Sequence, residues 1–268
     1  MQASVFTEGS SGTLYIGVST KMYLGYQASL RWLEQVREVV DARTEVVAGG
    51  PVQVFAIPAF PLLESARRIL NGSPVRLGAQ NCSWSDGPLT GEVSAGMLAE
   101  LGVSLVEVGH AERRSLFGED DVVVARKVNA VVEAGLAPLL CIGEQERMAP
   151  SAAARFCSEQ VRSALGEHGW SRGSLRSVLL AYEPLWAIGA PAPADPAYVN
   201  QVVAALRSVL RESTGAEAGI IYGGSAGPGL LPRLGSVDGL FLGRFAHDPA
   251  NLGSVIDEAL ALGPVVTA

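Results

Sequence analysis

Short apolar runs without polar alternation recur eight times along the chain, and this repetition constrains the fold more than any other feature. They occupy residues 13–19, 52–59, 75–82, 104–109, 137–143, 178–184, 218–225 and 239–243. Segments with helical spacing separate them, for example at 28–42, 120–135, 152–169 and 197–214. Strands with no polar face are typical of a parallel sheet covered by helices. The pattern predicts an α/β fold, a single-domain (β/α)8 barrel over residues 1–268, with 1–12 as a loose N-terminal extension.

An open, doubly wound sheet is the alternative arrangement of such units. Its dinucleotide-binding form would carry a GxGxxG sequence after the first strand, and none is found there. No long linker rich in Pro, Gly or Ser divides the chain. A closed barrel is therefore favoured.

Composition and charge exclude several classes of protein. Hydrophobic residues make up 48% of the chain, yet no apolar run reaches the roughly 18 residues that a membrane span requires. The N-terminus lacks the features of a signal peptide. Cys82, Cys141 and Cys157 show no metal-ligand spacing and suit reduced packing residues of a cytoplasmic protein. A net charge of −7 argues against nucleic acid and membrane surfaces as partners.

A barrel carries its chemistry at the C-terminal ends of its strands, and polar residues of this chain fall there. Lys21 follows the first run, His110 follows the fourth, and Glu183 ends the sixth. Glu183 is the only charged residue in SVLLAYEPLWAIGAPAPA, residues 177–194, a setting that suits managed proton transfer or a buried structural carboxylate. His110 allows a core histidine as the alternative, and Lys21 allows an ordinary surface lysine.

Five longer motifs make the interpretation specific. They are LGAQNCSWSDGPLTGE, VGHAERRSLFGE, LCIGE, YEPLWAIG and IIYGGSAG, at residues 77–92, 108–119, 140–144, 182–189 and 220–227. Their order and spacing resemble the triosephosphate isomerase family from residue 14 to about 262. The resemblance implies a dimeric (β/α)8 barrel that shifts a carbonyl along a short sugar phosphate without a metal or an organic cofactor. This family is itself the established example of a glutamate base working with a neutral histidine under a closing loop.

The resemblance also implies roles for individual residues. Glu183 of YEPLWAIG would be the base, and His110 of GHAERR would be the electrophile. Lys21 would stabilise oxyanion charge, and Glu112 would pair with it and orient it. The substrate and its phosphate would contact Ser19, Gly189, Gly224, Ser225, Gly243 and Arg244.

Two further segments take their interpretation from the family. Residues 184–190 resemble its mobile lid, which expels water from the site when it closes. Residues 83–90 resemble the loop that reaches into the partner barrel, so we expect a homodimer. An exposed loop that carries Trp84 and Leu89 is also easier to explain if a partner covers it.

The chain departs from the family pattern at positions that would shape the substrate site. The usual Asn-Trp-Lys-Met-Asn is Ser-Thr-Lys-Met-Tyr at 19–23, and Ala111 replaces the serine after the histidine. Pro191 in the lid tip has no N–H, and Arg244 replaces a glycine. Acid and base remain while these positions change, which predicts a four-carbon ketose phosphate such as L-erythrulose 1-phosphate. Triose phosphate isomerisation and a non-catalytic sugar-phosphate-binding barrel are the alternatives.

Overall fold

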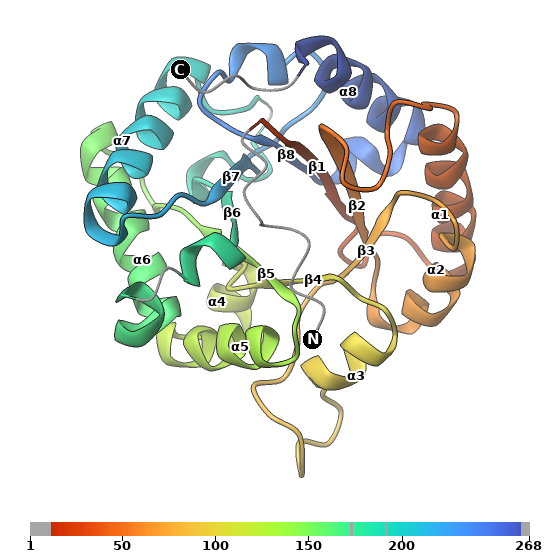
Figure 1. Cartoon of the computed structure of the whole chain (residues 1–268), viewed down its shortest axis with the longest axis horizontal. Coiled ribbons are helices and arrows are strands. Elements are labelled where there is room, and N and C mark those ends of the chain that lie inside the picture. The colour runs from red at the N-terminus through yellow and green to blue at the C-terminus, as the bar shows by residue number, and fades with distance from the viewer. Residues whose placement is uncertain (1–11, 172–173, 191, 264–268) are drawn as a thin grey trace.

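The strands follow one another around a closed barrel. The computed structural model describes residues 12–171, 174–190 and 192–263, so nearly all of the predicted N-terminal extension lies outside the described residues. Within these ranges eight parallel strands pair in chain order, and β1 closes the barrel against β8 (Figure 1). They are β1 Leu14–Ser19, β2 Val52–Ile57, β3 Arg76–Ala79, β4 Leu105–Val108, β5 Ala137–Ile142, β6 Leu179–Tyr182, β7 Gly219–Tyr222 and β8 Gly239–Leu242. The predicted barrel is confirmed, whereas a single domain over the whole chain stays a prediction.

Seven of the eight predicted strands extend beyond the observed ones at their C-terminal ends, and only the first ends where predicted, at Ser19. Residues 75–82 were expected to be extended, but β3 ends at Ala79, and the run 218–225 keeps only Gly219–Tyr222 in the sheet. The residues between the observed and the predicted ends of these strands leave the sheet and form the rim of the barrel. An apolar run therefore marks a strand together with the turn that follows it.

Helices surround the barrel and cover its outer face (Figure 1). They are α1 Tyr26–Asp41, α2 Leu63–Ile69, α3 Ala95–Glu100, α4 Ala111–Phe117, α5 Asp121–Glu133, α6 Pro150–Ser171, α7 Pro196–Thr214 and α8 Pro249–Leu262. The helical segments expected at 28–42, 120–135, 152–169 and 197–214 match α1, α5, α6 and α7 closely. Asp120, Asp195 and Asp248 accept a backbone N–H at the starts of α5, α7 and α8, which fixes where those helices begin.

Two apolar layers hold the structure together, one on each face of the sheet. Ile16 and Val18 of β1 pack outward with the helices, and Tyr15 packs inward with Phe55 and Phe241 inside the barrel. Because side chains alternate along a strand, every second residue enters the barrel. All strand residues are buried apart from the first residues of β3 and β7, which explains why the runs lack polar alternation.

The same alternation decides which polar groups face the interior at the rim. In β4, Leu105 enters the barrel, so Glu107 follows it on the inner side. After β6, Leu179 and Ala181 point inward, and Glu183 continues that row. Acidic side chains at the rim are thereby directed into the mouth of an apolar barrel.

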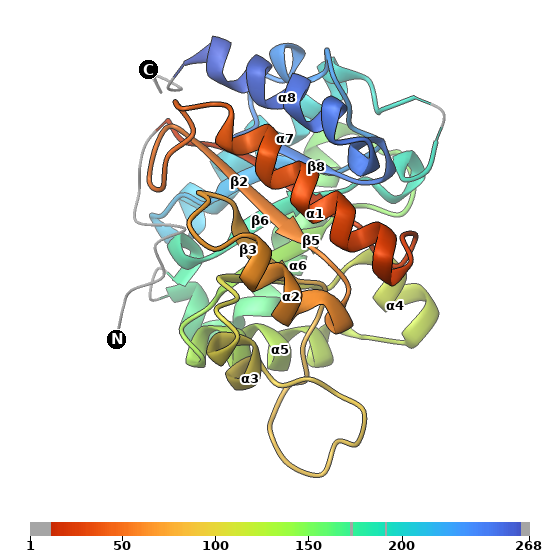
Figure 2. The same cartoon turned by 90° about the vertical axis from the view of Figure 1, so that its right-hand side faces the viewer.

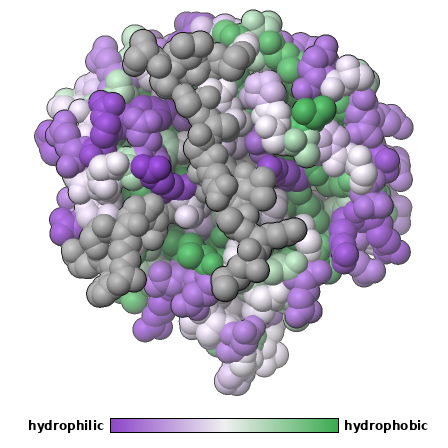
Figure 3. Space-filling model, viewed as in Figure 1, coloured by the Kyte–Doolittle hydropathy of each residue, from purple (hydrophilic) through white to green (hydrophobic). Residues whose placement is uncertain are grey.

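The two faces of the barrel differ. In Figure 2 the strand arrows point to the right, toward the rim that carries α4. Figure 3 shows the opposite face, where hydrophilic residues are spread around the edge of the molecule. The loop between β3 and α3 projects from the body in both cartoon views (Figures 1 and 2). No helix in the described ranges combines the length and hydropathy needed to cross a membrane.

The packing of the barrel interior predicts the effect of one methyl group. A Cβ added to Gly17 would lie 2.0 Å from the ring of Phe55, which packs 6.0 Å from the ring of Phe241. Gly17→Ala should therefore lower the free energy of unfolding by about 1–3 kcal/mol, the cost of overpacking a core. Urea denaturation measures this.

Gly235→Ala is the matched control, because no atom lies within 4 Å of its added Cβ and its φ is not in the positive region that alanine avoids. We expect a change within about 0.5 kcal/mol. Equal effects of the two substitutions would contradict this account of the interior.

Candidate active site

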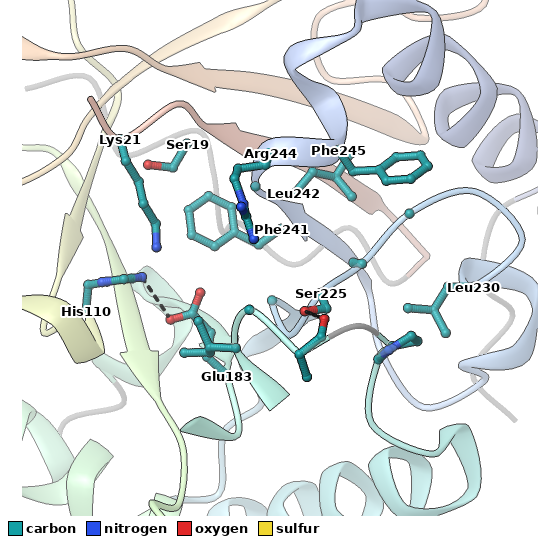
Figure 4. A pocket seen from close by; sticks show the side chains of 18 of the residues that line it. Ser19, Lys21, His110, Glu183, Ser225, Leu230, Phe241, Leu242, Arg244 and Phe245 are labelled. Carbon is teal, nitrogen blue, oxygen red and sulfur yellow. Dashed lines mark hydrogen bonds and ion pairs between the residues drawn. The ribbon is translucent and has the colours of Figure 1, made fainter. Parts of the chain in front are cut away.

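A cavity of about 920 Å³ opens at the C-terminal rim of the strands and collects most of the predicted site residues (Figure 4). Its lining includes Ser19, Lys21, His110, Glu112, Glu183, Gly189, Ser225, Gly243 and Arg244. Gly224 lies between the lining residues Gly223 and Ser225, with the Tyr222 hydroxyl 2.5 Å from where its Cβ would be. The close approach of this hydroxyl explains why a glycine is needed in the turn, and phosphate binding by Gly224 stays a prediction.

Glu183 is buried at the mouth of the barrel, with 4% of its surface exposed. Burial raises the pKa of its carboxyl to about 8, and the charge of Glu107 adds to this effect. Lys21 and a hydrogen bond with the Cys141 thiol act in the opposite direction. A Cβ on Gly223 would lie 2.6 Å from Glu183 Oε1, so glycine is required there to leave space for the carboxyl.

His110 faces Glu183 as a neutral hydrogen-bond donor. It caps α4, and its Nδ1 accepts the backbone N–H of Glu112 at 3.1 Å. A neutral imidazole that accepts at Nδ1 carries its proton on Nε2, which lies 3.6 Å from Glu183 Oε2. Burial, followed by the charge of Lys21, lowers the pKa of His110 to about 4. The imidazole is thus uncharged at neutral pH.

Lys21 reaches the cavity from a strained turn after β1. Its φ of 48° lies in the left-handed region that residues other than glycine rarely adopt, a conformation that clusters at functional sites. Its Nζ donates to Glu112 Oε1 at 2.5 Å. Burial alone would lower the pKa of Lys21, but the hydrogen bond and charge of Glu112 raise it. The ammonium group stays charged, and Glu112 fixes its position.

Sequence reasoning missed one carboxylate in the cavity, Glu107 of β4. The residue is 4% exposed, and its Oε2 accepts the Ser19 hydroxyl at 3.0 Å. Its Oε1 lies 3.9 Å from His110 Nε2. Burial raises the pKa of Glu107 to about 7, against the effects of Ser19 and Lys21. The signal was available, because Glu107 is the only charged residue of its strand and stands in inward register with Leu105.

Two tight backbone turns and an arginine lie at the other end of the cavity. Ser225 has a φ of 46°, a second left-handed residue on the turn after β7. Gly243 precedes a short 3-10 turn, Arg244–His247, at the end of β8. The guanidinium of Arg244 lies 5.7 Å from the centre of the Tyr23 ring and is directed into the cavity (Figure 4). A second arginine, Arg233, also belongs to the lining.

The segment after Glu183 closes over the cavity. Ile188, Gly189 and Ala190 belong to the lining. The Ser225 hydroxyl donates to the carbonyls of Ala187 at 2.9 Å and Ala190 at 3.1 Å. Pro191, whose missing N–H was noted in the sequence, lies outside the described residues.

The buried carboxylate of Glu144 holds the beginning of the same segment in place. Glu144 accepts hydrogen bonds from Trp186 Nε1 at 2.9 Å, Tyr198 at 2.9 Å and Tyr182 at 3.1 Å. On the far side, the N–H of Ala194 donates to the Tyr222 hydroxyl at 3.0 Å. The segment is thus held at both ends by hydrogen bonds to buried side chains.

The cysteines are packing residues, as predicted. All three are buried free thiols. Cys141 lies inside the barrel, and burial followed by the charge of Glu183 raises its pKa well above the usual range. A thiol of this kind stays protonated and is a poor nucleophile.

A buried carboxylate, a neutral imidazole and a lysine around one cavity are the groups that enzymes use for proton transfer beside a carbonyl. The sequence profile of the triosephosphate isomerase family matches residues 14–259. The chain belongs to this family, which confirms the resemblance seen in the motifs.

Two named relatives and one solved structure are similar to this chain over most of its length. The chain is 47% identical over 257 residues to L-erythrulose-1-phosphate isomerase of Pectobacterium atrosepticum, covering 94% of this chain and 98% of that protein. Identity to the protein of the same name from Mycolicibacterium smegmatis is 39% over 254 residues, covering 92% and 94%. The crystal structure of triosephosphate isomerase from Bartonella henselae superposes with a TM-score of 0.76 at 30% identity, covering 91% and 98%.

The electrostatics of the cavity predict a pH dependence. A base works only when ionised, and the pKa of Glu183 is raised to about 8 in the free protein. The kcat/KM for the substrate should therefore rise with pH up to about 8 and fall about tenfold per unit below it. Initial rates measured over a pH series test this. A flat profile between about pH 6 and pH 9 would contradict the assignment.

Proposed function

We propose that the protein is an isomerase that moves the carbonyl of L-erythrulose 1-phosphate by one carbon. The observation that carries this proposal is the buried Glu183 carboxylate facing the Nε2 of a neutral His110 at 3.6 Å. The identity of 47% to a protein named L-erythrulose-1-phosphate isomerase supports the choice of substrate.

The chemistry follows from the side chains of the cavity. Glu183 removes a proton from the hydroxyl-bearing carbon next to the carbonyl. His110 donates its Nε2 proton to the carbonyl oxygen, and the Lys21 ammonium stabilises the negative charge that develops there. Glu112 holds Lys21 in place at 2.5 Å. The hydroxyl on the deprotonated carbon then gives its proton to His110, and Glu183 delivers its proton to the former carbonyl carbon, which completes the shift.

The proposed substrate gives a definite product. In L-erythrulose 1-phosphate the carbonyl at C2 stands between the phosphate-bearing C1 and the hydroxyl-bearing C3. A shift by one carbon places the carbonyl at C3, so the product is an erythrulose 4-phosphate, again a ketose. Dihydroxyacetone phosphate has no C4, and the same shift gives an aldehyde.

Turnover of both substrates by the purified protein tests the proposal. We expect a higher kcat/KM for L-erythrulose 1-phosphate than for dihydroxyacetone phosphate. In deuterated water, label should enter the carbon next to the carbonyl of the substrate. Equal or better turnover of the triose phosphate would contradict the four-carbon substrate, and absence of both turnover and label would indicate a binding protein.

Glu183→Gln tests the role of the base. The amide preserves shape but cannot accept a proton, so kcat should fall by about 10² or more. The melting temperature should not fall, because the substitution removes a buried group that resists ionisation. Near-normal turnover by a folded Glu183→Gln protein would contradict the role.

Arg244 is proposed to bind the phosphate together with the turns that contain Ser225 and Gly243. Arg244→Ala should weaken binding by about 1.5–3 kcal/mol, the scale of a hydrogen bond to a charged group. The loss should appear mainly in KM, since the contact is made equally in the ground and transition states. Arg211→Ala is the control, because Arg211 is exposed and paired with Glu217 on the surface. An unchanged KM in Arg244→Ala would remove this role.

We also propose a homodimer in the cytoplasm. The loop between β3 and α3 projects from the body (Figure 2), and its Trp84 is 39% exposed. Met22, next to the site lysine, is 89% exposed, and a partner that covers it would relieve this cost. Sedimentation at micromolar concentration that shows only monomer would contradict the dimer.

A further inference from the structure

Glu107 is a buried acid that the proton transfer described above does not use. Burying an ionisable carboxyl at the end of an apolar row costs several kcal/mol unless it is paired. Leu105 fills the equivalent inward position one step deeper in the same strand. An apolar side chain would therefore serve at position 107 if packing were its only role.

The contacts of Glu107 leave one oxygen directed at the reaction centre. Oε2 accepts the hydroxyl of Ser19 at 3.0 Å, which fixes the orientation of the carboxyl. Oε1 lies 3.9 Å from His110 Nε2, and this Nε2 is itself 3.6 Å from Glu183 Oε2. No hydrogen bond to Oε1 is found among the residues that the structure describes. A ligand hydroxyl close to the reacting carbon would be within reach of this oxygen.

The arrangement of the cavity indicates which end of the substrate lies near Oε1 of Glu107. Figure 4 shows Arg244 and Ser225 on one side of Glu183, and His110, Lys21 and Ser19 on the other. With phosphate at Arg244, the chain of a ketose phosphate runs past Glu183 toward Ser19. In a four-carbon ketose the terminal hydroxymethyl group is attached to the carbon that loses its proton to Glu183. Its hydroxyl therefore falls at the end of the cavity lined by Ser19 and Glu107.

We propose that Glu107, oriented by Ser19, is the specificity-determining residue that binds the terminal hydroxyl of a four-carbon ketose phosphate. The hydroxyl donates its hydrogen bond to Oε1 while Oε2 keeps the Ser19 contact. A triose phosphate carries hydrogen in place of this hydroxymethyl group, so it leaves a buried carboxyl oxygen without a donor. A site built to bind a hydroxyl in this way rejects an analogue that lacks it. This inference rests on the proposed function and names the residue that selects the substrate.

Three substrates separate recognition of the hydroxyl from general effects on the site. They are L-erythrulose 1-phosphate, its 4-deoxy analogue and dihydroxyacetone phosphate, each assayed for kcat/KM. The wild-type protein should prefer the first over the 4-deoxy analogue by at least about 10²-fold. Glu107→Leu should reduce this preference to below about tenfold, mainly by losing activity on the four-carbon substrate. Turnover of the two substrates without the terminal hydroxyl should change by less than about tenfold or rise.

Glu107→Gln keeps the shape of the side chain and one acceptor oxygen, so the preference should fall to an intermediate value. It also covers the case in which the leucine variant does not fold, which melting curves would show. Ser19→Ala should lower the preference in the same direction, since it frees the carboxyl to rotate. Glu133→Gln, which removes an exposed charge on α5, should leave the preference unchanged.

Two results would overturn the role of Glu107. One is a wild-type preference that persists in both Glu107 variants. The other is an equal loss on all three substrates, which would show that Glu107 only supports His110 and Glu183. Failure of the proposed function has a different signature. In that case the wild-type protein itself would turn over dihydroxyacetone phosphate at least as well as L-erythrulose 1-phosphate.

Discussion

Desolvation of Glu183 at the mouth of the closed barrel is the interaction on which the site depends. Closure directs every second strand residue inward, and Ala181 and Leu179 form the apolar row beneath the carboxyl. The acid consequently meets protein instead of water on its inner side, and its pKa rises to about 8. On the protein surface, where the pKa of a glutamate is lower, the same carboxylate would be a weaker base for removing a proton from carbon. The position of Glu183 in the fold thus determines its basicity as much as its residue type does.

Much of this arrangement could be predicted from the sequence because burial leaves a readable pattern. Strands covered on both faces appear as unbroken apolar runs, so all eight were found, although the C-terminal ends of all but the first were placed too late in the chain. Glu183 stood out because it interrupts such a run, and Lys21 because it follows the first run directly. Their convergence followed from the rule that parallel strands carry functional groups at one rim.

Other features were missed because the sequence pattern encodes them weakly or not at all. Helices α2, α3 and α4 have seven residues or fewer, too few for a clear helical period. Glu107 was passed over because one acid in the four residues LVEV looks like ordinary strand polarity until the register shows that it points inward. Nothing in the sequence indicated that the Tyr222 hydroxyl lies 2.5 Å from where a Cβ of Gly224 would be, because that contact joins a side chain to the turn that follows its own strand.

The charges of the cavity explain why Arg244 accompanies the second carboxyl. The chain carries a net charge of −7, and the cavity is lined by the acids Glu107, Glu112 and Glu183 and by the cations Lys21, Arg233 and Arg244. Lys21 is already paired with Glu112, so its charge is partly neutralised before a substrate arrives. With both buried acids ionised, the end of the cavity that holds them would repel a phosphate dianion. In the proposed function, Arg244, whose guanidinium lies 5.7 Å from the centre of the Tyr23 ring, would offset that repulsion at the phosphate. The acid proposed to bind a hydroxyl and the cation proposed to bind the phosphate would thus be two parts of one electrostatic arrangement.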